Sequence, residues 1–180
     1  MKKEVMILTG AGQIGMVIAR RMGAGIKIVI GDKKLENAQT IAQIMNETGF
    51  DTMPVEAILK VDLYGTAVLL EEVGKVIKEG GVGVTISSQS GWRMPALTAK
   101  EDELLATTPT EELLKLDILQ PENIRDTLHA YQMAKRCNEK RVMAESVKWG
   151  ERGARLNDIA PGIVVTPLAL DEFNGPRGDF

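Results

Sequence analysis

The chain has 180 residues, enough for one domain with a sizeable hydrophobic core. Its 44% hydrophobic and 26% charged residues are typical of a soluble globular protein, and its net charge of -3 argues against a nucleic-acid partner. No apolar run reaches the length of a membrane span, and the single cysteine, Cys137, excludes an internal disulfide and favours a cytoplasmic location.

Short apolar runs alternate with amphipathic stretches along the chain. Buried strands are predicted at residues 5–9, 26–30, 52–55, 82–87 and 154–159. Helices are predicted at residues 14–22, 35–48, 57–79 and 124–149. This alternation predicts an α/β fold with a doubly wound, Rossmann-like parallel sheet, and we expect a single domain over residues 1–180.

A glycine pattern, Gly10-x-Gly12-x-x-Gly15, lies between the first predicted strand and helix. Glycines let the backbone bend tightly, and the helix N-terminus then offers free N–H groups to a dinucleotide pyrophosphate. Asp32 ends the second predicted strand, where a carboxylate can accept hydrogen bonds from ribose hydroxyls and repel a 2′-phosphate. This favours NAD, although Lys33 beside it could accept that phosphate and keeps NADP open.

Tyr131 and Lys135 are four residues apart and share one face of the last predicted helix. A free tyrosine has a pKa of about 10 and is a poor base at neutral pH. A nearby ammonium group favours the phenolate and brings the tyrosine toward a useful range. Because this spacing also arises by chance, its interpretation depends on the segments around it.

Those segments are Ser88 at the end of the fourth predicted strand and the proline-bounded run at residues 161–167. With Tyr131 and Lys135 in this order, they resemble the short-chain dehydrogenase/reductase family. The resemblance implies an oxidoreductase that moves hydride between NAD(P) and a secondary alcohol or ketone. Tyr131 would exchange the proton, Lys135 would also hold the nicotinamide ribose, and Ser88, three residues before Gly91, would orient the substrate oxygen.

The resemblance implies further cofactor contacts in two loops. The residues concerned are Gln13, Ile14, Pro161, Gly162, Ile163 and Thr166. In the second loop, the Ile163 backbone and the Thr166 hydroxyl would bind the nicotinamide carboxamide. A proline-defined turn without a binding role is the alternative for this loop.

Asp62 stands where the family often has an asparagine that supports a proton-relaying water. A carboxylate cannot donate as an amide does, but Asp62 could still bind that water or pair with Lys135. The segment between Ser88 and Tyr131 is longer than in most relatives, with an insertion at 96–123 that resembles the 3α-hydroxysteroid dehydrogenase/carbonyl reductase branch.

Helices are expected within this insertion at residues 100–107 and 110–119. It could cap the substrate pocket, alter subunit contacts in a homodimer or homotetramer, or be a surface loop. Trp92 and Met94 would supply apolar surface for a steroid-like or other apolar carbonyl substrate. His129 and Cys137 are expected to have packing or surface roles, and no cluster of side chains has metal-ligand spacing.

One segment of the family pattern is missing, because the third predicted strand leads directly into the helix at 57–79. Parallel neighbours need a crossover of a dozen or more residues, so we expect Val55 and Glu56 not to be bonded neighbours. Their Cα separation should then be several times the 3.8 Å or so of a trans peptide. A normal separation would indicate a deletion and favour the alternative function, a catalytically inactive binding or oligomerisation module.

Overall fold

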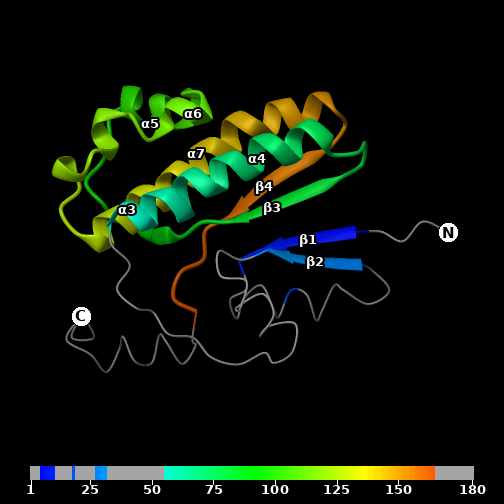
Figure 1. Cartoon of the computed structure of the whole chain (residues 1–180), viewed down its shortest axis with the longest axis horizontal. Helices are drawn as coiled ribbons and strands as arrows, with labels where there is room; N and C mark the ends of the chain where they lie inside the picture. The colour runs from blue at the N-terminus through cyan, green and yellow to red at the C-terminus, as the bar shows by residue number, and fades with distance from the viewer. Residues whose placement is uncertain (1–4, 11–17, 19–26, 32–54, 165–180) are drawn as a thin grey trace. The chain divides into compact units, whose positions relative to one another are not determined.

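The computed structural model describes residues 5–10, 18, 27–31 and 55–164 (Figure 1). The chain divides into two compact units, Met1–Asp51 and Thr52–Phe180. The helix predicted at residues 35–48 lies outside the described residues.

In the first unit, β1 (Val5–Thr9) and β2 (Lys27–Gly31) form a parallel pair. The register runs from Val5 opposite Lys27 to Thr9 opposite Gly31. The first strand has the predicted bounds, and the second is shifted by one residue. Parallel neighbours require a crossover, and Ile18 in the connection between them is helical.

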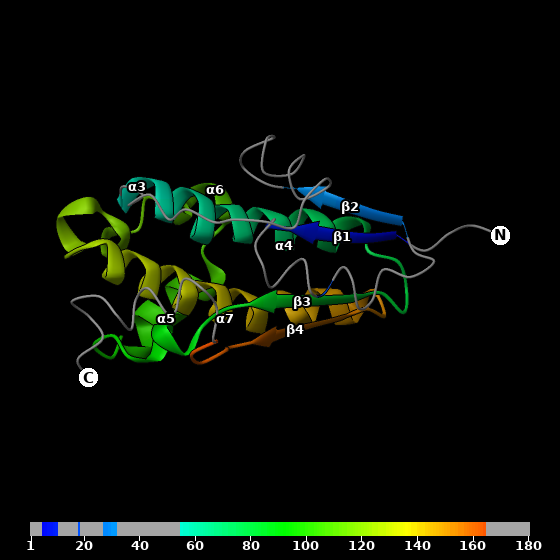
Figure 2. The same cartoon turned by 90° about the horizontal axis from the view of Figure 1, so that it is seen from below.

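In the second unit, β3 (Val82–Ile86) and β4 (Arg155–Ile159) form another parallel pair. The long helix α7 (Thr127–Glu151) lies along these strands, beside α4 (Gly65–Val76), as Figures 1 and 2 show. Helix α7 begins where the Asp126 carboxylate accepts a hydrogen bond from the His129 N–H (2.7 Å), a side-chain N-cap. The α/β class and the parallel pairing are therefore confirmed.

The segment before α4 is helical from its first described residue. Helix α3 (Val55–Ile58) continues into a π-helix, η1 (Leu59–Tyr64), and then into α4. Val55 and Glu56 are consecutive residues of α3, so the prediction of a break between them is wrong. The strand predicted to end at Val55 is also wrong at that residue, because a short apolar run does not distinguish a strand from the start of a buried helix.

The insertion packs onto α7. It contains α5 (Ala99–Thr107), α6 (Thr110–Leu113) and two 3-10 turns, Asp117–Leu119 and Pro121–Asn123. Helix α5 was predicted almost to its bounds, and Thr98 and Glu101 form a capping box at its start. The second predicted helix ends after Leu113, because Leu116 leaves the helical region (ψ 136°).

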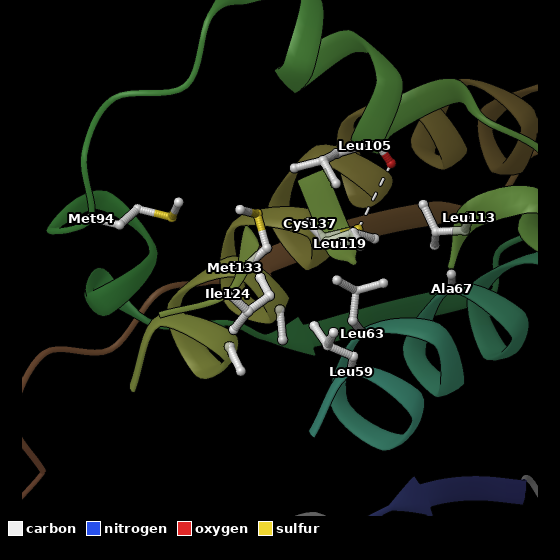
Figure 3. Close-up of a cluster of buried hydrophobic side chains, with 12 residues drawn as sticks. Leu59, Leu63, Ala67, Met94, Leu105, Leu113, Leu119, Ile124, Met133 and Cys137 are labelled. Atoms are coloured by element: carbon white, nitrogen blue, oxygen red, sulfur yellow. Dashed lines mark hydrogen bonds between the residues drawn. The ribbon is translucent and has the colours of Figure 1, made fainter. Parts of the chain in front are cut away.

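A cluster of buried side chains joins the insertion to α7 and η1 (Figure 3). Its members are Leu59, Leu63, Ala67, Met94, Leu105, Leu113, Leu119, Ile124, Ala130, Met133, Ala134 and Cys137. Burying a leucine of this kind contributes about 1.5–3 kcal/mol. The insertion is therefore part of the hydrophobic core.

A second cluster surrounds Trp149, whose indole N–H donates to the Leu70 carbonyl (3.1 Å). Two glycines make room for this ring. A Cβ at Gly74 would lie 2.7 Å from Trp149 Nε1, and a Cβ at Gly83 would lie 2.7 Å from Trp149 Cζ3. The two missing side chains thus allow α4 and β3 to approach the end of α7.

Candidate active site

Three of the predicted catalytic residues belong to elements that pack together in the second unit. Ser88 follows β3 and caps the 3-10 turn η2 (Gln89–Trp92), and Tyr131 and Lys135 lie on α7. Both η2 and η1, which carries Asp62, contact α7. The fold therefore brings the elements of the predicted group to one helix.

Lys135 is the centre of this arrangement. Its ammonium lies 5.5 Å from the centre of the Tyr131 ring and donates to the Ile86 carbonyl at the end of β3 (3.2 Å). Burial lowers the pKa of Lys135, while attraction to Asp62 and Asp158 opposes that shift. A half-buried cation beside a tyrosine favours the phenolate form of that tyrosine.

Ser88 has a defined hydrogen-bonding role. Its Oγ accepts from the Ser90 N–H (3.1 Å), which leaves the hydroxyl hydrogen available to another acceptor. Gly91 explains how the turn reaches α7, because a Cβ there would lie 2.8 Å from Arg136 N and 3.2 Å from the carbonyl carbon of Lys135. The glycine three residues after Ser88 thus sets the close approach of η2 to the helix that carries Lys135.

Asp62 lies in the π-helix, a feature that sequence periodicity did not indicate. The Thr66 hydroxyl donates to the Asp62 carbonyl oxygen (2.8 Å), and the Asp62 carboxylate attracts the Lys135 ammonium. Single π-helical turns occur often at functional sites. The attraction between Asp62 and Lys135 agrees with the second role considered for this residue.

The predicted cofactor residues are only partly described. Gly10 follows β1 with a φ of 86°, a conformation that favours glycine. In the second loop, the Pro161 carbonyl accepts from the Gln89 N–H (3.0 Å), and Ile163 is 65% exposed. The remaining predicted cofactor residues lie outside the described part of the chain: Gly12, Gln13, Ile14, Gly15, Asp32, Lys33 and Thr166.

The two predicted substrate residues have different surroundings. Met94 is buried in the core cluster, at 9% exposure, whereas Trp92 is 57% exposed. The Arg136 guanidinium lies 3.8 Å from the Trp92 ring centre, a cation–π contact. Trp92 also lines an open cavity of about 390 Å³, together with Met143, Leu156 and other side chains of α7 and β4.

Next to Ser88 is a group that the sequence reasoning missed. The buried Ser87 hydroxyl lies 2.5 Å from Asp158 Oδ2 and 3.2 Å from Glu139 Oε1. Burial raises the pKa of both carboxyls. Both acidic residues lie on elements that also carry other polar and charged residues, so no local pattern marked them, and their meeting depends on the pairing of β3 with β4.

The remaining candidates have packing roles. Cys137 is fully buried, and burial raises the pKa of its thiol to about 12, as expected for a core side chain. His129 accepts from the Arg125 N–H at the start of α7 (3.2 Å). Among the described residues, no group of histidine, cysteine and acidic side chains could hold a metal ion, and no helix is long and apolar enough to cross a membrane.

No protein-family model matches the chain. A short-chain dehydrogenase/reductase of Alternaria brassicicola is 32% identical over 213 residues, covering 93% of this chain and 76% of the relative. The 3-alpha-hydroxysteroid dehydrogenase/carbonyl reductase of Comamonas testosteroni is 28% identical over 72% of this chain and 50% of its own length. The D-threitol dehydrogenase of Mycolicibacterium smegmatis is 26% identical over 81% of this chain and 45% of its own length.

One solved structure has the same fold. The 3-alpha-hydroxysteroid dehydrogenase of Pseudomonas sp. B-0831, crystallised with NADH, matches with a TM-score of 0.63 at 22% identity, over 97% of this chain and 78% of that one. The alignment with the Alternaria relative spans more positions than the 180 residues of this chain. That relative therefore has residues without a counterpart here.

Proposed function

Because the chain belongs to the short-chain dehydrogenase/reductase family, we propose that it is an NAD(P)-dependent oxidoreductase acting on a secondary alcohol or ketone. The observation that carries the proposal is the half-buried Lys135 ammonium, which lies 5.5 Å from the centre of the Tyr131 ring and donates a hydrogen bond to the Ile86 carbonyl, at the end of the strand that leads to Ser88. This arrangement can supply a proton to a carbonyl oxygen, or remove one from an alcohol.

Each side chain has a distinct role in the proposal. Tyr131 gives its phenolic proton to the substrate oxygen during reduction and takes it back during oxidation. Lys135 stabilises the phenolate by its charge, and Asp62 supports the charged state of Lys135. Ser88 donates its hydroxyl hydrogen to the substrate oxygen, because its Oγ accepts a hydrogen bond from the Ser90 N–H and its own hydrogen remains available. The nicotinamide cofactor, when bound, supplies or accepts the hydride.

One described residue of the expected cofactor site, Gly10, has a conformation that suits a dinucleotide. Gly10 has a positive φ directly after β1, and within the described part of the chain no atom lies within 4 Å of the place a Cβ would occupy. That geometry is suited to the close approach of a pyrophosphate. We propose NAD as the preferred cofactor, because Asp32 would repel the 2′-phosphate of NADP, and the Pseudomonas relative of the same fold was crystallised with NADH.

The substrate is proposed to be an apolar ketone or secondary alcohol, with steroids as the first class to test. Two relatives are named for action on 3-alpha-hydroxysteroids, and Trp92 offers exposed aromatic surface four residues after Ser88. A panel of ketones with NADH and NADPH, followed by nicotinamide absorbance, tests this class. Turnover of small polyols but of no apolar ketone would contradict it.

Tyr131→Phe tests the catalytic assignment. The substitution removes only the ionisable oxygen, so turnover should be abolished while the affinity for the nicotinamide cofactor stays nearly unchanged. Steady-state rates and titration of NADH fluorescence measure the two effects separately. Substantial activity in this variant would show that another group exchanges the proton.

Asp32→Ala tests the choice of cofactor. Removing the carboxylate should narrow the preference for NADH over NADPH, because the repulsion of a 2′-phosphate is lost. The ratio of kcat/KM values for the two cofactors is the measurement. An unchanged ratio would mean that Asp32 does not face the ribose.

A second candidate function is a catalytically inactive binding or oligomerisation module. It is favoured by the continuous helix from Val55 and by the described strands, which form two separate pairs. The intact Ser88, Tyr131 and Lys135 favour the enzyme. An increase in NADH fluorescence on mixing, with no turnover across the ketone panel, would support the module.

We also propose a homodimer or homotetramer in the cytoplasm. Apolar side chains on α7 support self-association, since Met143 is 55% and Val147 is 63% exposed. The single cysteine is buried and free, as in proteins of reducing compartments. Light scattering of the purified chain tests the assembly, and a monomer at micromolar concentration would contradict it.

A further inference from the structure

Ser87 lies between two carboxyl groups that come from different elements. Its hydroxyl oxygen is 2.5 Å from Asp158 Oδ2 on β4 and 3.2 Å from Glu139 Oε1 on α7. Ser87 is 3% and Glu139 is 4% exposed, so water cannot easily replace these contacts. The group lies one residue before Ser88 and one helical turn after Lys135.

The number of protons in this group is limited. A serine hydroxyl has one hydrogen and can donate to one of the two carboxyls. The second oxygen–oxygen contact needs a proton of its own, which one of the carboxyls must hold. Electrostatic repulsion between two carboxylates in one site is a second, independent reason against the doubly ionised state.

Glu139 is the better holder of that proton. It is the more deeply buried carboxyl, whereas Asp158 is half-buried and is attracted by the Lys135 ammonium. The 2.5 Å contact from Ser87 to Asp158 has the length of a hydrogen bond to an ionised oxygen. The two hydrogen bonds therefore run in one direction: the Glu139 carboxyl donates to Ser87, and the Ser87 hydroxyl donates to Asp158.

The charges around the pair are consistent with this order. From α7, the Lys135 ammonium donates to the carbonyl of Ile86, the residue before Ser87 (3.2 Å), and attracts Asp158. Arg136 acts on Glu139 but is itself bound to Asp102 on α5, and a hydrogen bond with Trp92 offsets part of the effect of burial on Glu139. From η1, Asp62 faces Lys135. The second oxygen of the Asp158 carboxyl, Oδ1, is buried and has no hydrogen-bond partner among the described residues, so the attraction of Lys135 has to offset the cost of burying this charge.

We infer that Asp158 is a positioning residue for the proposed reaction: Glu139 holds the shared proton, Asp158 stays ionised, and its charge keeps Lys135 as the ammonium that acts on Tyr131. The inference rests on the proposed function, because Lys135 matters there through its effect on Tyr131. It adds a structural reason for the acidic residues at positions 139 and 158.

The first test does not depend on activity. A double-mutant cycle of Lys135→Met and Asp158→Asn, measured by urea unfolding of the full chain, isolates the interaction of the two side chains. We expect a coupling of about threefold or more in the unfolding equilibrium constant. Additive effects would overturn the inference. A coupling found in a chain that turns over no alcohol would support the inference and count against the proposed function alone.

The second test is the pH profile of alcohol oxidation, which rises as Tyr131 ionises. Asp158→Asn should move the rising limb to higher pH by about half a unit or more, the equivalent of a threefold change. Glu139→Gln should leave the limb in place, since an amide imitates the protonated acid. Asp117→Asn, which removes an exposed carboxylate, controls for net charge.

Two results would overturn the inference in this test. One is an unmoved limb in Asp158→Asn, and the other is an equal shift in Glu139→Gln, which would make Glu139 the ionised member. Should Asp158→Asn fold poorly, Asp158→Thr is the second variant, because it also removes the charge and keeps a polar group beside Ser87. The same limb shift is expected from it.

Discussion

Gly91→Ala should impair turnover by displacing the turn that carries Ser88. The new Cβ would lie 2.8 Å from Arg136 N and 3.2 Å from Arg136 Cα, both backbone atoms of α7 that cannot rotate away. Since the obstacle is a helix backbone, the turn η2 has to move. Ser88 is attached directly to that turn and moves with it.

The magnitude follows from two opposing effects. Overpacking of this kind costs about 1–3 kcal/mol. Replacing glycine by alanine at an ordinary φ recovers about 0.4–1 kcal/mol by restricting the unfolded chain, and Gly91 is not among the described glycines with positive φ. The net loss of stability is therefore about 0–2.6 kcal/mol. A displacement approaching 1 Å at Ser88 can lower kcat by about 100-fold.

The assay compares Gly91→Ala with Gly150→Ala. A Cβ at Gly150, on α7, would meet nothing within 4 Å, so this control should be stabilised by about 0.5–1 kcal/mol and keep its kcat. Urea unfolding, kcat and NADH affinity are measured for both variants. If Gly91→Ala were as stable and as active as the starting protein, the argument that Gly91 positions Ser88 would be refuted.

Three further substitutions test the energetics of the second unit. Leu63→Ala, at a fully buried position, should cost about 2–5 kcal/mol in urea unfolding; a loss below about 1 kcal/mol would contradict the core assignment. Asp102→Asn should cost about 1 kcal/mol at pH 7, because it weakens the hydrogen bonds from Arg136 and Lys140. Burial raises the pKa of Asp102, but the hydrogen bonds from Arg136 and Lys140 outweigh it and hold that pKa below its ordinary value. The stability of the wild type therefore falls as the pH drops through the lowered pKa. The difference in stability between the wild type and Asp102→Asn should shrink below about pH 4. Burial raises the pKa of Glu139, so the wild type loses stability as the pH rises above about 4, whereas Glu139→Gln does not. The difference in stability should therefore grow in favour of the variant. A difference that is independent of pH would show that Glu139 is ionised at neutral pH.

The local sequence was sufficient for most elements of the fold. The apolar run of β1 ends at a glycine and the helix-prone, acidic run of α5 ends before Pro109, so both had evident ends, and α7 differs from its predicted range by a few residues. The error at Val55 arose where an apolar run was too short to have a period. The π-helical turn at Asp62 could not be predicted, because it depends on how that helix packs and not on residue types.

The order of Ser88, Tyr131 and Lys135 pointed to the site, since each residue belongs to an element that the pattern had located. The partnership of Ser87 with Glu139 and Asp158 was different. Its members are separated by 52 and 71 residues and meet only through the pairing of strands and the position of α7. The sequence alone therefore could not predict that Ser87, Glu139 and Asp158 are in contact.

Two glycines on different elements, Gly74 and Gly83, both depend on the size of the residue at position 149. A side chain at position 74 or 83 needs the space that the indole ring occupies, so either glycine can change only when position 149 becomes smaller. Related chains should therefore vary at these three positions together, with tryptophan accompanied by two glycines. A library that randomises the three positions at once should yield folded sequences that single-site libraries would reject.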